Sequence, residues 1–289
     1  MVDDWYLAEI TERRSLLDEA HSRCFQAEPW TMQAQWEVLS LCLAALATQA
    51  PEHFRLDIHG ERCEFENRLS GEILRFRMWD DMTLDCQPLD LAGRHVQEDL
   101  ILLAQREDDL FLDAGSVCFP ANWSFPFDAG MSYTQIHSPV PYFGKHLAPK
   151  AQAFLERIQA YEQWQRLNWT MTVKRRLDTS AEKYHIWQPD SLGLDLDNVG
   201  RLVHLRVEVQ KFVRLPVSNL LLFTIHTYMQ PLEEIVGNPE WTSRLEAVMA
   251  SLPDTVAEYK EIAHYKDLVI QYCAKQSYPS AKELVSRSN

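Results

Sequence analysis

A histidine close to two prolines is the first residue in this sequence that could do chemistry. His137 lies in the segment Ile-His-Ser-Pro-Val-Pro at positions 136–141. Proline fixes its own φ and restricts the residue before it, so this loop presents the imidazole with little conformational freedom, as an axial metal ligand requires. A surface or core histidine with a hydrogen-bonded ring is the more common outcome. Spacing alone leaves both interpretations open.

Polar residues also alternate along two segments whose composition is typical of strands. Arg206, Glu208 and Gln210 would share one face of a strand, and the segment 166–169 (Arg-Leu-Asn-Trp) alternates in the same way. In a dry core such side chains are costly unless each has a partner. Periodicity therefore favours a solvated outer face of a sheet for them.

A second histidine lies in another strand-like segment. His226 would share a face with Thr224 and Tyr228, while Phe223 and Ile225 point to the other side. A hydrogen-bonded structural histidine is the commoner outcome for such a position.

Several motifs that identify enzyme classes do not occur in the sequence. It has no G-x-G-x-x-G, P-loop, H-E-x-x-H or G-x-S-x-G pattern, and only 9 Gly with which to build phosphate loops. The cysteines at 24, 42, 63, 86, 118 and 273 form no C-x-x-C pair, which argues against a zinc ribbon or an iron–sulfur site. We expect these cysteines to be reduced and buried.

Charge and hydropathy exclude further classes of partner. The 289 residues include 28 Lys+Arg and 42 Asp+Glu, a net charge of −14 that repels phosphate backbones and anionic lipids. The apolar stretches 38–50 and 220–225 fall short of the roughly 20 residues that span a bilayer. The first residues, MVDDWYLAEITERR, are acidic where a signal peptide is basic. We expect a cytoplasmic protein with no nucleic-acid or membrane partner.

The elements that must position these residues follow from periodicity and from the prolines. We predict helices at 32–48, 95–105, 147–165, 232–235, 241–251 and 256–275, and strands at 110–119, 168–173, 202–215 and 220–228. The segment 53–69 is typical of two short strands joined at His59-Gly60, and 216–219 suits a hairpin turn. Prolines exclude a long element between 119 and 142. This order predicts an α+β fold with a mainly antiparallel sheet.

The central part of the chain resembles a known family, the catalytic α subunit of heme-dependent oxidative N-demethylases. The resemblance covers about 96–232 and consists of short segments in the family's order. They are Val-Gln-Glu-Asp-Leu at 96–100, Cys-Phe-Pro at 118–120 with Trp123, the 136–141 segment, Arg-Leu-Asn-Trp at 166–169, Leu-Arg-Val-Glu-Val-Gln at 205–210, Arg-Leu-Pro at 214–216, and Leu-Phe-Thr-Ile-His-Thr-Tyr at 222–228.

The resemblance implies a PAS-like antiparallel sheet flanked by helices, with N- and C-terminal helical additions. Its core would be 93–232, with a helix and hairpin region at 1–92 and helices at 233–289 packed into one compact unit. It also implies a b-type heme and a monooxygenase that uses dioxygen to oxidise a small amine by N-demethylation, releasing formaldehyde.

Site residues are carried over from the matching segments. His137 would be the proximal iron ligand, since it is the histidine of the family's segment. Arg166, Arg206 and Arg214 would pair with the heme propionates. We assign Glu208 and His226 as catalytic, with Glu208 binding or deprotonating the alkylammonium substrate.

Departures from the family pattern leave alternatives. The family commonly has arginine at the positions of Val209 and His226, and often Arg and Gly at those of Val217 and Asn219. A heme enzyme that hydroxylates the nitrogen of a larger amine would fit the same residues. A PAS-type heme gas sensor is a further alternative, although no kinase, cyclase or DNA-binding unit is found in the remaining segments.

The source of electrons is a separate question. Because the chain has no dinucleotide, flavin or iron–sulfur motif, we expect NADPH to reduce it through a separate reductase subunit or protein that carries flavin and iron–sulfur centres. The family resemblance implies the same partner.

Overall fold

A computed structural model describes residues 2–277, apart from the side chains at 145 and 146. In this range the main sheet has six antiparallel strands in the order β1-β6-β5-β9-β8-β7. They are β1 (Phe25–Ala27), β5 (Asp99–Arg106), β6 (Asp109–Ser116), β7 (Gln163–Val173), β8 (Val203–Arg214) and β9 (Leu221–Pro231). The antiparallel sheet and its helices confirm the predicted α+β class.

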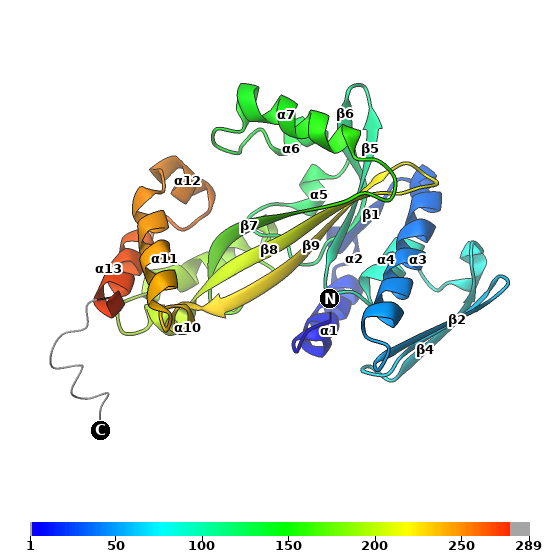
Figure 1. Cartoon of the computed structure of the whole chain (residues 1–289), viewed down its shortest axis with the longest axis horizontal. Coiled ribbons are helices and arrows are strands. Elements are labelled where there is room, and N and C mark those ends of the chain that lie inside the picture. The colour runs from blue at the N-terminus through cyan, green and yellow to red at the C-terminus, as the bar shows by residue number, and fades with distance from the viewer. Residues whose placement is uncertain (1, 278–289) are drawn as a thin grey trace.

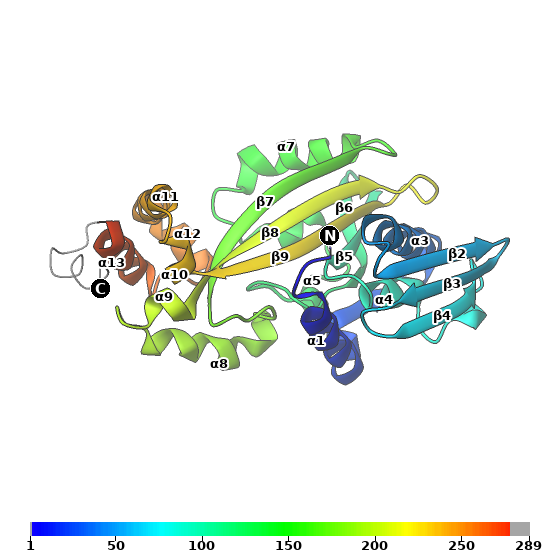
Figure 2. The same cartoon turned by 60° about the horizontal axis from the view of Figure 1, so that its bottom comes forward.

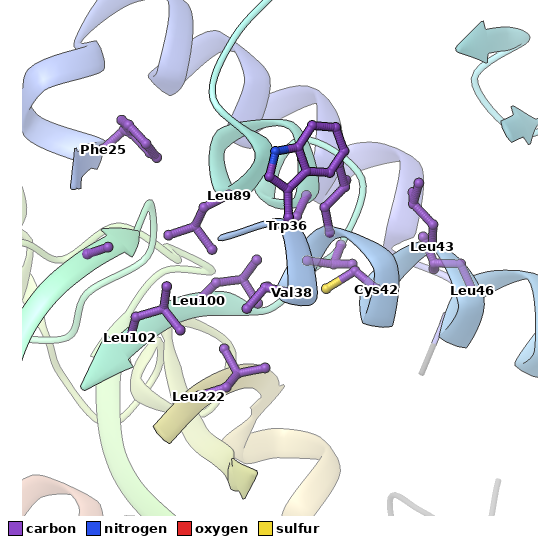
Figure 3. Close-up of a cluster of buried hydrophobic side chains, with 14 of the residues drawn as sticks. Phe25, Trp36, Val38, Cys42, Leu43, Leu46, Leu89, Leu100, Leu102 and Leu222 are labelled. Carbon is purple, nitrogen blue, oxygen red and sulfur yellow. The ribbon is translucent and has the colours of Figure 1, made fainter. Parts of the chain in front are cut away.

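A helical layer and a second sheet cover one face of the main sheet. This layer contains α1 (Tyr6–Glu19), α2 (His21–Cys24), α3 (Met32–Gln49) and α4 (Pro88–Gly93), with the small sheet β2 (Phe54–His59), β3 (Arg62–Asn67) and β4 (Glu72–Arg77). Figure 3 shows Leu100, Leu102 and Leu222 of the main sheet beside Val38 and Cys42 of α3. Because Leu222 is buried against this layer and strand residues alternate between faces, the other even-numbered residues of β9 also lie on this side of the sheet.

One group of helices covers the opposite face, and a second group gathers at the end of the long strands. At one end, Ile101, Phe212 and Ile225 pack under α5 (Phe125–Asp128), α6 (Tyr133–Ile136) and α7 (Gly144–Arg157). At the other end, α8 (Tyr184–Trp187), α9 (Val199–Leu202), α10 (Leu232–Ile235), α11 (Pro239–Ser251), α12 (Asp254–Tyr259) and α13 (Lys266–Ser277) follow the long strands. Figures 1 and 2 show α7 alongside β7, and α10–α13 gathered at one end of β7–β9. Within the described residues, no helix has the length and apolar character needed to cross a membrane.

Most predicted elements are confirmed, including the helix at 32–48, the 53–69 hairpin and the long β8–β9 hairpin. The helix predicted at 95–105 is wrong, because this segment contains β5, which pairs with both β6 and β9. Its run of apolar residues is buried on both faces, and periodicity cannot distinguish such a strand from a buried helix.

Other boundaries also differ from the prediction. The helix predicted at 147–165 ends at Arg157, and β7 begins at Gln163. The helix predicted at 256–275 is two helices, α12 and α13, with Glu261 between them in the left-handed region at φ 57°. The strands β1 and β4 were not predicted. Positions 278–289 of the predicted C-terminal helical region lie outside the described residues.

Candidate functional site

His137 directly follows α6, whose first turn is fixed by a capping box. The Ser132 hydroxyl accepts from the Gln135 N–H at 3.3 Å, and the Gln135 side chain accepts from the Ser132 N–H at 2.9 Å. Nδ1 of His137 lies 2.9 Å from the carbonyl oxygen of Tyr133. Because a carbonyl oxygen only accepts, Nδ1 must be the protonated nitrogen, and the neutral ring keeps a free lone pair on Nε2. No described residue hydrogen-bonds to Nε2.

Two aromatic rings hold the imidazole in place. The ring of Tyr133 lies 4.1 Å from it and that of Phe143 lies 4.8 Å from it, centroid to centroid. Burial lowers the pKa of His137; the hydrogen bond to the Tyr133 carbonyl opposes this in part, and the positive charge of Arg166 adds to the lowering. The site therefore favours the neutral imidazole, which is the form that binds a metal.

A hydrogen-bonded network of polar side chains runs across β7 and β8. Arg166 Nε donates to Gln210 Oε1 at 2.6 Å, and Gln210 Nε2 donates to Glu208 Oε2 at 2.9 Å. Asn168 Nδ2 donates to the same Glu208 oxygen at 3.2 Å. Oε1 of Glu208 has one neighbour, Arg206 Nε at 3.4 Å. One carboxylate oxygen is thus fully used, while the other can accept a further hydrogen bond.

The prediction that this face is solvated is wrong. Arg206, Glu208 and Gln210 are 0%, 6% and 4% exposed. Hydrogen bonds offset much of the cost of burying them: those of Glu208 and Gln210 are described above, and Arg206 donates through its terminal nitrogens. Their shared face was predicted, whereas their burial depends on segments far away in the sequence.

Arg206 is bound to the main chain. Its terminal nitrogens donate to the carbonyl oxygens of Leu177 and Phe119, both at 2.6 Å, and to Thr227 Oγ1 at 3.3 Å. Both terminal nitrogens of this guanidinium are thus used within the protein.

Arg214 is bound in the same manner. Its guanidinium donates to four main-chain carbonyl oxygens, those of Leu155, Glu156, Ile158 and Asn219, at 2.9–3.3 Å. Arg166, in contrast, is exposed, and no described residue hydrogen-bonds to its two terminal nitrogens. Of the three arginines, Arg166 is the one that can still bind an anion.

Glu208 also lies near a lysine from the C-terminal helices. Lys260 directly follows α12, and its Nζ donates to the Trp169 carbonyl oxygen at 2.6 Å. Burial lowers the pKa of Lys260, and the negative charge of Glu208 opposes this shift. Tyr142, in the loop after His137, is hydrogen-bonded through its hydroxyl to Thr255 of α12 at 3.3 Å. The His137 loop and α12 are thus joined on the side of the sheet that carries Glu208.

His226 lies on the opposite face. In the β8–β9 register Glu208 is paired with Thr227, and His226 is paired with Val209. Because successive residues of a strand alternate, the structure does not bring His226 and Glu208 together. The His226 ring stacks on Tyr228 at 4.4 Å, and its nitrogens lie 3.4 Å from Glu98 and 3.5 Å from Asp3.

Several large apolar side chains on α5, α7 and β7 are exposed. Phe127 of α5 is 70% exposed, and Trp164, two residues before Arg166 on the same face of β7, is 46% exposed. Phe154 of α7 contacts Trp164 edge to face at 5.0 Å. In the described part of the chain, no three His, Cys, Asp or Glu side chains are placed so that they could jointly hold a metal ion.

A cavity of about 520 Å³ lies elsewhere, near the β8–β9 turn. Trp30, Arg106 and Asp113 are among its lining residues. Arg106 is paired with Asp113 through both terminal nitrogens, and no histidine lines this cavity. Its arginine is thus already paired with a carboxylate, unlike the terminal nitrogens of Arg166.

Some residues of the site were not identified from the sequence. Tyr133 and Phe143 orient His137, and Lys260 approaches Glu208 from more than 50 positions away. The Ser-x-x-Gln spacing at 132–135 is a capping-box signal that could have placed a helix just before His137. Nothing in the sequence pattern indicates Lys260.

Comparison with protein families identifies the family of the chain. Residues 1–270 match the family model described as "Haem-dependent oxidative N-demethylase, alpha subunit-like". The chain therefore belongs to this family, which confirms the resemblance and extends it from 96–232 to the N-terminal region and most of the C-terminal helices.

Proposed function

We propose that this member of the heme-dependent oxidative N-demethylase α-subunit-like family is a monooxygenase that oxidises a small amine and releases formaldehyde. The observation that carries the proposal is the orientation of His137. Its Nδ1 is held by the Tyr133 carbonyl, its Nε2 lone pair has no described partner, and its surroundings favour the neutral ring. This is the arrangement that an axial histidine needs.

The residues present fit a b-type heme. Nε2 of His137 would be the proximal ligand, and the free nitrogens of Arg166 would pair with a propionate. Phe127 and Trp164 would cover part of the macrocycle. When bound, heme supplies the activation of dioxygen that no side chain can supply.

The side chains of the chain itself handle the amine and its proton. Oε1 of Glu208 accepts a hydrogen bond from the substrate N–H and takes up the proton of an alkylammonium, so that the nitrogen becomes neutral. Asn168 and Gln210 hold the other oxygen and fix the orientation of the carboxylate. We propose no role in this step for His226, since it lies on the opposite face.

Oxidative N-demethylation needs electrons from outside the chain. Each N-methyl group consumes one dioxygen, two electrons and two protons, and the products are the N–H amine, formaldehyde and water. We propose that NADPH supplies the electrons through flavin and iron–sulfur centres on partner chains, in keeping with the α-subunit-like description of the family. We also propose a PAS-like core, supported by the antiparallel order β6-β5-β9-β8-β7 with helices on both faces.

An absorption spectrum tests the proposal. The purified chain, expressed with adequate heme supply, should show the Soret band of histidine-ligated heme, which shifts on titration with an N-methyl secondary amine. His137→Ala should lose the histidine-ligated signature, and added imidazole should partly restore it. His204→Ala is a matched control, because Nδ1 of His204 also faces a main-chain carbonyl, that of Leu202 at 3.1 Å.

Two results would refute the proposal. A wild-type protein without a Soret band does not bind heme. A His137→Ala protein with the wild-type spectrum takes its axial ligand from another residue. With a reductase and NADPH, the intact enzyme should also form formaldehyde and demethylated amine in equal amounts.

A further inference from the structure

Gln210 joins two parts of the site that have different tasks. Its Oε1 accepts from Arg166 Nε at 2.6 Å, and its Nε2 donates to Glu208 Oε2 at 2.9 Å. A carboxylate can only accept and a guanidinium can only donate, so the two neighbours fix both ends of the amide. Gln210 is 4% exposed, which leaves it little access to water as a substitute partner.

These two hydrogen bonds of Gln210 form a bridge between Arg166 and Glu208, and the bridge affects both residues. At Arg166 it uses Nε and leaves the two terminal nitrogens without a hydrogen bond to any described residue. At Glu208 it occupies Oε2 together with Asn168, so Oε1 is the oxygen that can still accept. No other described residue contacts both Arg166 and Glu208 through hydrogen bonds.

We propose that Gln210 is a positioning residue that couples anchoring of the cofactor carboxylate by Arg166 to amine binding by Glu208. This inference rests on the proposed function and deepens it. Loss of the bridge should weaken binding at both ends, although Gln210 itself touches neither ligand. A residue that only fills the core would affect stability and neither binding constant.

The first test uses heme-loaded protein. Gln210→Leu keeps the approximate size but removes both hydrogen bonds, and we expect about tenfold weaker heme binding and about tenfold weaker amine binding, followed by the Soret band. Gln165→Leu is the matched control, because Gln165 is an exposed glutamine on the other face of β7. The control should bind heme and amine like the wild type.

The second test needs no heme. In Gln210→Glu the introduced carboxyl group faces Glu208 at the position of the amide, and two such carboxylates share a proton. Carbon-13 NMR of the glutamate carboxyl carbons, with the Glu208 signal identified by its loss in Glu208→Gln, should show the Glu208 titration shifted upward by more than one pH unit. The other charged or titratable groups facing Glu208 are Arg206 on its own strand, and Tyr259 and Lys260 from the C-terminal helices. All three are unchanged in this variant.

The outcomes separate this inference from the proposed function. If the wild type binds heme but Gln210→Leu keeps both affinities within twofold of it, the coupling role of Gln210 is wrong and the function stands. An unshifted Glu208 titration in Gln210→Glu overturns the bridge whether or not heme binds, and this readout remains if Gln210→Leu fails to fold. A wild-type chain without heme binding ends the proposed function and the cofactor half of the inference.

Discussion

Arg206 should act as a structural residue, and its replacement gives a quantitative test. Arg206→Met keeps the length and apolar stem of the side chain but removes the guanidinium. The change leaves the carbonyl oxygens of Leu177 and Phe119 without their donors. It also leaves the buried carboxylate of Glu208 without its nearest positive charge.

The size of the effect follows from these contacts. Each of the two 2.6 Å hydrogen bonds is from a charged donor, a kind worth about 1.5–3 kcal/mol. Breaking a buried ion pair by removing one partner costs about 3–5 kcal/mol. Because these contributions overlap, we expect the free energy of unfolding to fall by about 3–5 kcal/mol. That is a large part of the roughly 5–15 kcal/mol that stabilises a typical domain.

Urea denaturation of the heme-free protein, followed by far-ultraviolet circular dichroism, measures this change. Arg244→Met is the control: Arg244 is 77% exposed and pairs with the exposed Glu240, so its free energy of unfolding should fall by less than about 1 kcal/mol. Arg166→Met should bind heme more weakly. An Arg206→Met protein within 1 kcal/mol of the wild type would show that the main-chain contacts of this arginine do not stabilise the fold.

Two further changes test the layer under the opposite face of the sheet. Burial lowers the pKa of His95 from 6.5 to about 4, so between these pH values the unfolded chain binds a proton that the folded chain does not. The contribution of His95 to stability is therefore complete above pH 6.5, and the free energy of unfolding should fall by about 3 kcal/mol on acidification to pH 4. Urea titrations of His95→Phe should lack this loss. The Glu37 carboxylate accepts from the N–H groups of Val217 and Ser218, both at 2.8 Å. Glu37→Gln should therefore reduce the free energy of unfolding by about 1.5–3 kcal/mol and lower the urea midpoint. The exposed control Glu52→Gln should leave the midpoint unchanged.

The parts of the fold that could be predicted are those in which local signals agree. The β8–β9 hairpin has β-branched and aromatic residues on both sides of a turn at 216–219, and Asn219 adopts the positive φ of 60° that suits such a turn. The segment that became β5 has no such signal. Its pairing on both edges with β6 and β9 decides its structure, and those partners are distant in the sequence.

For the site, sequence alternation correctly grouped Arg206, Glu208 and Gln210 on one face and could not tell whether that face is dry. The answer depends on which donors and acceptors surround it. Gln210 and Glu208 hydrogen-bond to side chains of the neighbouring strand β7, whereas the terminal nitrogens of Arg206 hydrogen-bond to main-chain carbonyls. Main-chain partners can come from any residue type, so they leave no trace in the sequence.

The same argument explains why one arginine of three remains free. Arg206 and Arg214 lie on β8, which has a strand on each side, so their guanidinium groups are enclosed and must be satisfied by the protein itself. Arg166 lies on β7, which has a neighbour on one side only. A cation on an edge strand can keep part of its hydrogen-bonding capacity for a ligand, because water satisfies it until the ligand arrives. The position of a strand within the sheet therefore separates binding from structural arginines, and that position is a property of the topology rather than of the local sequence.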